Sequence, residues 1–341
     1  MTRARPGPLA ISLGDPAGIG PELIAEAWAR RESEGLPSFA ALGGAEILQA
    51  AARTRGIDLP LKVVANLLAA SEVFADALPV IGTDDGPWSP GAPSREGAEL
   101  ALGSLAAATR LTVEREAAAL VTGPIAKARL AEVGFDHPGQ TEYVAAACGI
   151  PPADAVMMLA GPRLRAVPLT VHVALAEVPA LLTSDLIARR ARIVAAALKR
   201  DFGVSRPRLA VAGLNPHAGE GGKFGDEEQR VIAPAVSMLR DEGIDIVGPF
   251  PPDAMFTARA RARYDAALCM YHDQALIPLK ALDFDEGVNV TLGLPIVRTS
   301  PDHGTAFDIA GKGLADPGAM IAAIRMAGDC AARRAGDRAS G

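Results

Sequence analysis

Short apolar segments alternate with longer amphipathic segments along most of this chain. The apolar segments are bounded by glycine or proline, a pattern typical of strands that are buried on both faces of a sheet. They predict strands at residues 9–13, 39–42, 61–65, 117–121, 155–159, 164–173, 208–212, 244–247 and 266–271. Apolar positions at helical spacing predict helices at residues 21–31, 96–115, 185–200, 226–242 and 317–334. Strands that alternate with helices favour mainly parallel sheets joined by right-handed crossovers.

The composition supports an α/β protein. Hydrophobic residues make up 49% of the chain and aromatic residues only 4%, so small and branched side chains must fill the core. A length of 341 residues exceeds one ordinary domain. We therefore expect two lobes with room for a cleft between them.

Charge and cysteine content exclude several classes of protein. The net charge of -6 comes from acids and bases mixed along the chain, so there is no basic stripe for nucleic acid. No stretch of about 18 apolar residues predicts a membrane span. Cys148, Cys269 and Cys330 are far apart, which argues against disulfides and a thiolate metal site. We expect a cytoplasmic protein without a membrane or nucleic-acid partner.

Three of the five histidines stand at or just after the end of a predicted strand. His172 ends one such segment, and His217 and His272 follow two others. Ligands of open α/β sheets bind beyond the carboxyl ends of the strands, where loops converge. Three imidazoles at one edge are suited to a divalent metal and leave a coordination position open for substrate. Asn215 and Asp273 flank two of them, either as partners that orient the rings or as turn residues.

Two glycine-rich loops, LGDPAGIGPE at residues 13–22 and HAGEGGKFGDEE at residues 217–228, each join a predicted strand to a helix. Such loops can receive an anion, although neither has a GxGxxG or GxxxxGK pattern, and tight packing is an equal interpretation. The C-terminal third gathers further polar and charged side chains around glycines, namely Lys280, Asn289, Arg298, Asp302, His303 and Asp308. Lysine and arginine beside a metal are suited to phosphate or carboxylate.

Seven ordered strings of residues extend over nearly the entire chain. They are GDPAGIGPE, VTGPIAK, HPGQTEY, LNPHAGEGG, MYHDQ, GVNVTLGLPIVRTS and DHGTAFDIAGKG. Together they closely resemble the 4-hydroxythreonine-4-phosphate dehydrogenase family of pyridoxal phosphate biosynthesis.

The resemblance implies a two-lobed fold akin to isocitrate and isopropylmalate dehydrogenases, with the active site in the cleft between the lobes. Residues 1–130 and 302–341 would form the first lobe, and residues 131–301 would form a second lobe that carries the metal histidines and the dimer interface. It also implies a homodimer whose active sites are shared across the subunit interface.

The family's site residues match positions of this chain. The resemblance implies a divalent metal bound by His172, His217 and His272, the last from the neighbouring subunit. Zinc is the expected ion, with cobalt or magnesium as alternatives. It implies substrate contacts from Gln140, Thr141, Lys280, Asn289 and Arg298, with Lys280 also the expected proton-transfer residue. NAD, with NADP as the alternative, would contact His303, Gly304, Thr305 and Asp308.

One position departs from the family's pattern. Members commonly read GHTE, and that histidine contacts the substrate, whereas this chain has Gln140 between Gly139 and Thr141. Glutamine donates hydrogen bonds but carries no charge, so an ionic role at this position is in doubt. His137 lies nearby in the sequence and is an alternative source of an imidazole.

The implied reaction is NAD-dependent oxidation and decarboxylation of 4-phosphooxy-L-threonine to 3-amino-2-oxopropyl phosphate. A phosphorylated sugar acid such as threonate or erythronate 4-phosphate is the competing substrate, because relatives act on such compounds and Gln140 differs from the usual histidine. A metal-dependent hydrolase is a third hypothesis, since an open three-histidine site can also activate water.

Overall fold

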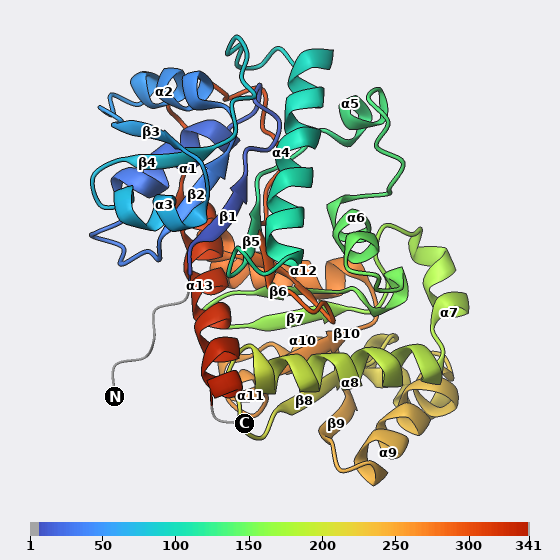
Figure 1. Ribbon diagram of the computed structural model, residues 1–341. Helices are drawn as coiled ribbons and strands as arrows, with labels where there is room; N and C mark the ends of the chain where they lie inside the picture. Colours follow the sequence, from blue (N-terminus) through green and yellow to red (C-terminus); the bar gives the residue numbers. More distant parts are fainter. Residues whose placement is uncertain (1–6, 340–341) are drawn as a thin grey trace. The chain divides into compact units, whose positions relative to one another are not determined.

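The structure is a computed structural model that describes residues 7–339, and it divides the chain into two compact units. Unit 1 comprises Met1–Pro152 and Leu294–Gly341, and unit 2 comprises Ala153–Gly293. Each unit contains a sheet flanked by helices, which confirms the predicted α/β class (Figure 1).

The sheet of unit 1 is entirely parallel. Its strands, in spatial order, are β3 (Leu61–Val64), β4 (Leu78–Ile81), β2 (Phe39–Leu42), β1 (Leu9–Ser12), β5 (Leu120–Thr122) and β12 (Arg298–Pro301). Most of these strands are short apolar runs buried on both faces. Because all six run in one direction, the loops that follow them lie along the same edge of the sheet.

Helices of unit 1 connect these strands and pack on the sheet. They are α1 (Gly20–Ala29), α2 (Ala45–Thr54), α3 (Leu67–Val73), α4 (Arg95–Val113), α5 (Lys127–Ala131), α6 (Gln140–Ala147) and α13 (Gly318–Ala339). The long helix α4 contacts β1, β2 and β5, and α13 contacts β12, β5 and β1 (Figure 1). Ser94 begins α4 as an N-cap, since its hydroxyl accepts a hydrogen bond from Gly97 N at 3.1 Å.

The sheet of unit 2 is mixed. Its spatial order is β11 (Val288–Leu292), β6 (Val156–Ala160), β7 (Arg165–Pro168), β10 (Ala266–Cys269), β8 (Arg208–Ala212) and β9 (Asp245–Phe250). β6 is antiparallel to both of its neighbours, while β7, β10, β8 and β9 are parallel. The loops after β7, β10 and β8 therefore share one edge of this sheet, and each of them carries one of the predicted metal histidines.

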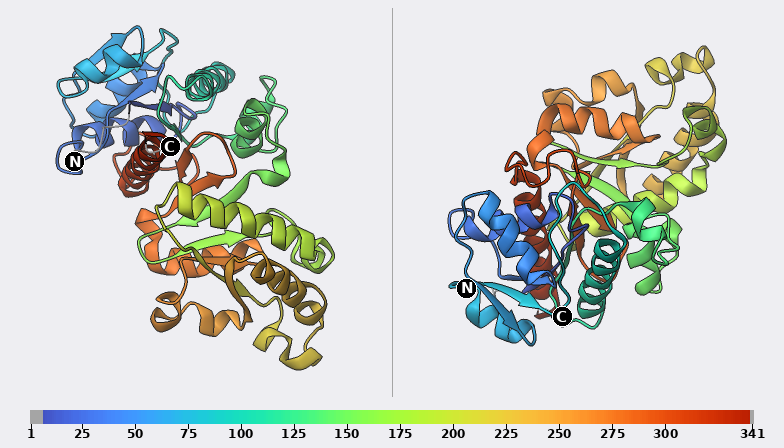
Figure 2. Two further views of the ribbon diagram at one scale, coloured as in Figure 1. Left: turned by 60° about the horizontal axis from the view of Figure 1, so that its bottom comes forward. Right: turned by 90° about the horizontal axis from the view of Figure 1, so that it is seen from above.

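Helices and shorter turns of unit 2 surround this sheet. The α-helices are α7 (Val178–Leu181), α8 (Ser184–Arg200), α9 (Ala233–Asp241), α10 (Pro252–Met255), α11 (Ala258–Arg261) and α12 (His272–Asp283). The remaining turns are η1 (Pro152–Asp154), which begins at the last residue of unit 1, η2 (Leu175–Glu177), η3 (Pro216–Gly222), η4 (Glu228–Ile232) and η5 (Phe284–Glu286). α8 contacts α9, and α12 covers β6, β7 and β10 (Figure 2).

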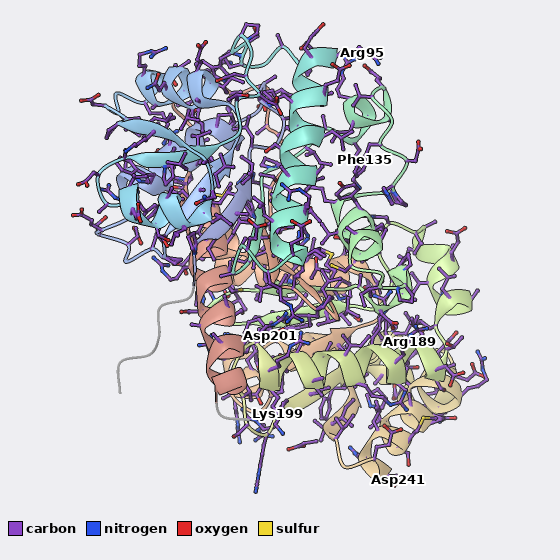
Figure 3. All side chains as sticks on the ribbon, in the orientation of Figure 1. Arg95, Phe135, Arg189, Lys199, Asp201 and Asp241 are labelled. Carbon is purple, nitrogen blue, oxygen red and sulfur yellow. The ribbon has the colours of Figure 1, made fainter. Side chains whose placement is uncertain are left out.

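Ion pairs at the surface of unit 2 tie helices to the sheet. Arg189 on α8, labelled in Figure 3, donates hydrogen bonds of 2.5 and 2.8 Å to Asp154, just before β6. The hydrogen bonding from Arg189 lowers the pKa of Asp154 below its ordinary value. Because the pair lies at the surface, with the Arg189 side chain 50% and the Asp154 side chain 29% exposed, we expect it to contribute little to stability.

Several element boundaries differ from the sequence prediction. The strand predicted at 164–173 ends at Pro168, so His172 lies in a loop and does not end a strand. The strands β4, β11 and β12 were not among the predicted segments. By their contacts, residues 131–152 and 294–301 group with unit 1, because α6 packs on α4 and β12 pairs with β5.

Among the helices of residues 7–339, none combines the length and the apolar character that crossing a membrane requires.

Candidate functional site

Three loops of unit 1 meet at the carboxyl edge of its sheet. Residues 13–19 follow β1, residues 82–94 follow β4 and residues 302–317 follow β12. Ile19 N donates a hydrogen bond to Thr305 O at 3.0 Å, and Gly91 N donates one to Ala17 O at 2.8 Å. A Cβ on Gly18 would lie 2.7 Å from Thr305 O, so this close approach requires glycine.

A buried carboxylate anchors the far end of the third loop. Glu22 on α1 is 0% exposed and accepts a hydrogen bond from Gly311 N. Its other oxygen lies 3.4 Å from the Arg55 guanidinium, which also pairs with Glu26. Glu22 thus links the GDPAGIGPE and DHGTAFDIAGKG strings through a contact between distant residues.

The predicted cofactor residues lie on this anchored loop. Gly304 and Asp308 are exposed, whereas His303 and Thr305 are half-buried. His303 Nδ1 lies 3.0 Å from Gly304 O. The structure therefore presents exposed backbone and a carboxylate on a segment held at both ends, an arrangement suited to hydrogen bonding with the sugar and amide groups of a nicotinamide cofactor.

A buried guanidinium forms the second feature of unit 1. Arg298, at the start of β12, is 4% exposed. Its Nη2 donates to Thr122 Oγ1 at 2.7 Å and its Nη1 donates to Thr141 Oγ1 at 3.4 Å. Burial lowers the pKa of Arg298 to about 10, and Glu142 acts in the opposite direction. The guanidinium still carries its charge at neutral pH and attracts anions to this place.

Gln140 is the first residue of α6 and precedes Thr141, which contacts this guanidinium. Its Nε2 donates a hydrogen bond to Gly123 O at 3.0 Å, in the loop after β5. Its Oε1 is buried and has no hydrogen-bond partner within the described part of the chain. Since α6 has no side-chain cap at Gly139, its first amide groups add further donors. The structure thus places Thr141, which follows Gln140, in contact with Arg298.

His137, the alternative imidazole, lies in an aromatic cluster. Its ring centre is 5.6 Å from that of Phe135, which Figure 3 labels, and 5.4 Å from that of Tyr143. Burial raises the pKa of Tyr143 above its ordinary value. These contacts give His137 a packing role. The side chain next to Thr141 is that of Gln140.

The predicted metal histidines occupy three loops of unit 2. His172 follows β7, His217 lies in η3 after β8, and His272 is the first residue of α12 after β10. The rings of His172 and His272 lie 5.9 Å apart and line one cavity of 280 Å³. Asp273 Oδ1 is 2.7 Å from His272 Nδ1, which fixes that ring and leaves Nε2 for a ligand.

His217 has a different setting within unit 2. Its ring centre lies 6.2 Å from that of Phe224, and Asn215 hydrogen-bonds to Glu227 and Glu228. No group of three histidine, cysteine or acidic side chains with metal-binding geometry occurs within residues 7–339 of the single chain. Two imidazoles at one cavity, with a carboxylate that orients one of them, nevertheless form a donor set suited to zinc or cobalt.

The other two predicted substrate residues belong to unit 2. Lys280 lies on α12, with Nζ 6.0 Å from the centre of the exposed Phe284 ring. Asn289 lies on β11, and its Oδ1 is buried with no hydrogen-bond partner among the residues that the structure describes. The predicted substrate residues are therefore divided between the two units.

Four residues at these sites escaped the sequence analysis. Thr122 contacts Arg298 and Glu142 influences its pKa, Glu228 contacts Asn215, and Glu22 contacts Gly311 in the loop of the predicted cofactor residues. Glu22, Thr122 and Glu142 lie in the motif strings, but their partners are far along the chain, whereas the main-chain partners of Glu228 lie 14 and 13 residues away.

The family model for the pyridoxal phosphate biosynthetic protein PdxA matches residues 36–327. The chain belongs to the PdxA family. This confirms the resemblance drawn from the seven strings.

Named relatives agree with the PdxA assignment. The chain is 64% identical over 328 residues to the 4-hydroxythreonine-4-phosphate dehydrogenase of Erythrobacter litoralis (strain HTCC2594), covering 96% of this chain and 98% of the relative. It is 52% identical over 328 residues to the enzyme of the same name from Zymomonas mobilis, covering 96% of both chains. The crystal structure of 4-hydroxythreonine-4-phosphate dehydrogenase from Klebsiella pneumoniae matches with a TM-score of 0.81 and 36% identity, over 95% of this chain and 99% of that chain.

Proposed function

We propose that this PdxA-family chain is an NAD-dependent 4-hydroxythreonine-4-phosphate dehydrogenase. It oxidises the C3 hydroxyl of 4-phosphooxy-L-threonine to a ketone, with the hydride passing to NAD and the hydroxyl proton to a base. The resulting β-keto acid loses carbon dioxide to give 3-amino-2-oxopropyl phosphate. The observation that carries this proposal is the buried Arg298 guanidinium, which donates to the hydroxyls of Thr122 at the end of β5 and Thr141 in the first turn of α6.

The Arg298 cluster is suited to the phosphate group of the substrate. A buried guanidinium with a fork of N–H donors binds a phosphate more strongly than a solvated one does, because little water competes. Thr141 and the uncapped amides of α6 supply further donors beside it. We assign phosphate binding to Arg298 and Thr141, and orientation of a substrate hydroxyl or ammonium to Oε1 of Gln140.

We assign the metal site to His172, His217 and His272. A divalent cation held there, zinc being the expected ion, supplies Lewis acidity that stabilises negative charge on substrate oxygens. Asp273 keeps the His272 ring in the tautomer that presents Nε2. Lys280 transfers protons, and Asn289 donates hydrogen bonds that orient the polar groups of the substrate.

We assign the NAD site to the loop that carries His303, Gly304, Thr305 and Asp308. The loop is anchored through Thr305 O and Gly311 N, so binding loses little conformational entropy. NADP differs from NAD by one further phosphate group, which would meet the carboxylate of Asp308. A carboxylate repels that group, which favours NAD.

We further propose a homodimer in which His272 completes the site of the neighbouring subunit. The exposed side of α12 carries Ile277, which is 66% exposed, Lys280, and at its end Phe284, which is 71% exposed. Large apolar side chains beside a proton-transfer lysine are expected where another chain covers the surface. A second copy of this chain is the occupant that the shared-site prediction requires. A cytoplasmic location of the protein belongs to the same proposal.

The side chain of Gln140 is also compatible with phosphorylated sugar acids as substrates. Its unpartnered Oε1 accepts a hydrogen bond from either an ammonium or a hydroxyl, so threonate or erythronate 4-phosphate is the competing substrate. Rates of NADH formation from 4-phosphooxy-L-threonine and from both aldonate phosphates separate the two. We expect the highest kcat/KM with 4-phosphooxy-L-threonine. A preference for an aldonate phosphate would contradict the assignment, and product release without NAD would favour the hydrolase hypothesis.

Subunit exchange tests the shared site. A His272→Ala chain mixed with a His217→Ala chain forms heterodimers that contain one intact site if His272 acts in the neighbouring subunit. We expect partial recovery of NADH formation after exchange. The two rings of His172 and His272 also approach within one chain, and ligands that all came from the same chain would give no recovery.

A further inference from the structure

The loop that carries His217 has an unusual backbone. Five consecutive residues, 217–221, have positive φ angles, namely 53°, 50°, 77°, 41° and 69°. His217, Ala218 and Glu220 are not glycines, so their side chains are strained in this conformation. A strained backbone of this kind persists only where surrounding contacts hold it.

Glu228 supplies those contacts. Its side chain is buried, with 3% of the residue exposed, although it lies at the start of η4. Oε1 accepts hydrogen bonds from Leu214 N and Asn215 N, both at 2.8 Å. Oε2 accepts one from Asn215 Nδ2 at 3.1 Å. The carboxylate therefore fixes the two peptide groups that lead into Pro216 and His217.

The carboxylate also fills the inside of the loop. A Cβ on Gly219 would lie 2.6 Å from Glu228 Oε2, and one on Gly213 would lie 3.1 Å from Oε1. No lysine or arginine lies within ion-pair distance of Glu228 in the part of the chain that the structure describes. Its negative charge is balanced by N–H groups of the loop, so the loop and the carboxylate depend on each other.

We propose that Glu228 is a positioning residue that holds His217 in the orientation in which its imidazole binds a divalent cation. The proposal rests on the metal site of the proposed function. Without the carboxylate, the donors of Leu214 and Asn215 lose their acceptor and the left-handed turn relaxes. His217 then moves away from the place where it meets the other ligands.

Cobalt binding by the full-length, metal-free protein tests this role without any turnover. Glu228→Gln keeps the size of the side chain but replaces one carboxylate oxygen by an NH₂ group. The donors of Leu214 and Asn215 therefore lose one of their acceptors. We expect cobalt to bind about tenfold more weakly or worse, as for other residues that orient metal ligands, with an altered visible absorption spectrum. Glu220→Gln is the matched control. Glu220 lies in the same turn, where its exposed carboxylate pairs with Lys223 at 3.4 Å, and the substitution should change affinity less than about twofold.

A second variant keeps the test decisive if Glu228→Gln fails to fold. Asn215→Ala removes the Oε2 contact of Glu228 and the hydrogen bond to Glu227 but keeps both main-chain donors to Oε1, and we expect a smaller loss of cobalt affinity in the same direction. If a folded Glu228→Gln or Asn215→Ala protein keeps the cobalt affinity and spectrum of the wild type, the positioning role is overturned. The metal site itself is then unaffected. A wild-type protein that takes up no cobalt would overturn the metal site and this proposal together.

Discussion

Gln140 and Gly123 are joined by a hydrogen bond of 3.0 Å from the side-chain Nε2 to the main-chain carbonyl. This contact settles which way the amide faces, because the reverse orientation would place two oxygens against each other. Oε1 is consequently turned away from Gly123 and is left as a buried acceptor. Position 140 thus presents a neutral acceptor in this chain.

Replacing this amide by a carboxylate should weaken substrate binding. Gln140→Glu loses the donor to Gly123 and brings a negative charge close to the proposed phosphate site. We expect KM for 4-phosphooxy-L-threonine to rise about tenfold, equivalent to about 1.4 kcal/mol, with a smaller change in kcat. Steady-state kinetics measure both. An unchanged KM would place the phosphate elsewhere.

The fork geometry of Arg298 should matter as much as its charge. Lysine keeps the charge but cannot contact Thr122 and Thr141 together, so Arg298→Lys leaves one hydroxyl without its donor. We expect KM to rise about tenfold or more, given the usual strength of charged hydrogen bonds. Binding of inorganic phosphate, measured by calorimetry, should weaken in parallel. Equal affinities in the two proteins would show that charge alone suffices.

Glu22 should control the cofactor loop through Gly311. Glu22→Ala removes the acceptor of Gly311 N, and we expect the dissociation constant for NAD to increase about tenfold because the loop loses its anchor. Glu26→Gln is the control, since Glu26 lies on the same helix as Glu22 and pairs with Arg55, at the end of α2. Calorimetry should show near-normal NAD binding for this control. Similar losses in both variants would indicate general disruption of α1.

Asp15 should make stability depend on pH in a direction opposite to most acidic residues. Burial raises the pKa of Asp15, against the hydrogen bond from Ala17 N and the charge of Arg129. A carboxyl with a raised folded-state pKa contributes stability that is complete below its ordinary pKa and is lost as pH rises through the folded-state value.

The matched variant for this effect is Asp15→Asn, which keeps an acceptor for Ala17 N and has no charge. As pH rises from about 4 to about 8, the wild type should lose stability relative to this variant, by about 1.4 kcal/mol per unit of pKa shift. Urea unfolding at several pH values measures the difference in free energy. A difference that stays constant with pH would show that Asp15 titrates normally.

The sequence predicts the strands whose buried side chains form an unbroken apolar run. Residues 39–42 and 208–212 were predicted with the bounds that the structure has, because burial on both faces leaves a continuous apolar signal. The sequence did not predict β12, because Arg298, Thr299 and Ser300 are polar residues, although all three are buried. Their polar groups find partners inside the fold, as Thr299 Oγ1 does with Ala323 O at 2.9 Å.

Proline explains two further differences. β7 ends at Pro168, which lacks the N–H that a continuing ladder requires, although the apolar pattern runs on to Val173. α12 contains Pro278 in its interior, so its sequence does not have the usual pattern of a helix. The histidines were nevertheless placed at the correct edge, because the order of strands and loops does not depend on these boundaries.

The contacts that build the sites lie beyond the reach of sequence patterns. Glu22 and Gly311 are 289 residues apart along the chain, and Arg298 and Thr122 are 176 apart. Residue types and motif order indicated which residues matter. Only the packing of loops along one sheet edge shows which of them touch.

NADH formation by metal-free protein, before and after zinc is returned, tests the central claim most directly. With 4-phosphooxy-L-threonine and NAD present, we predict no activity without metal and recovery that saturates near one zinc per active site. The His172→Ala protein should not recover at the same zinc concentration. NADH formation that continues undiminished after complete removal of metal would contradict the account.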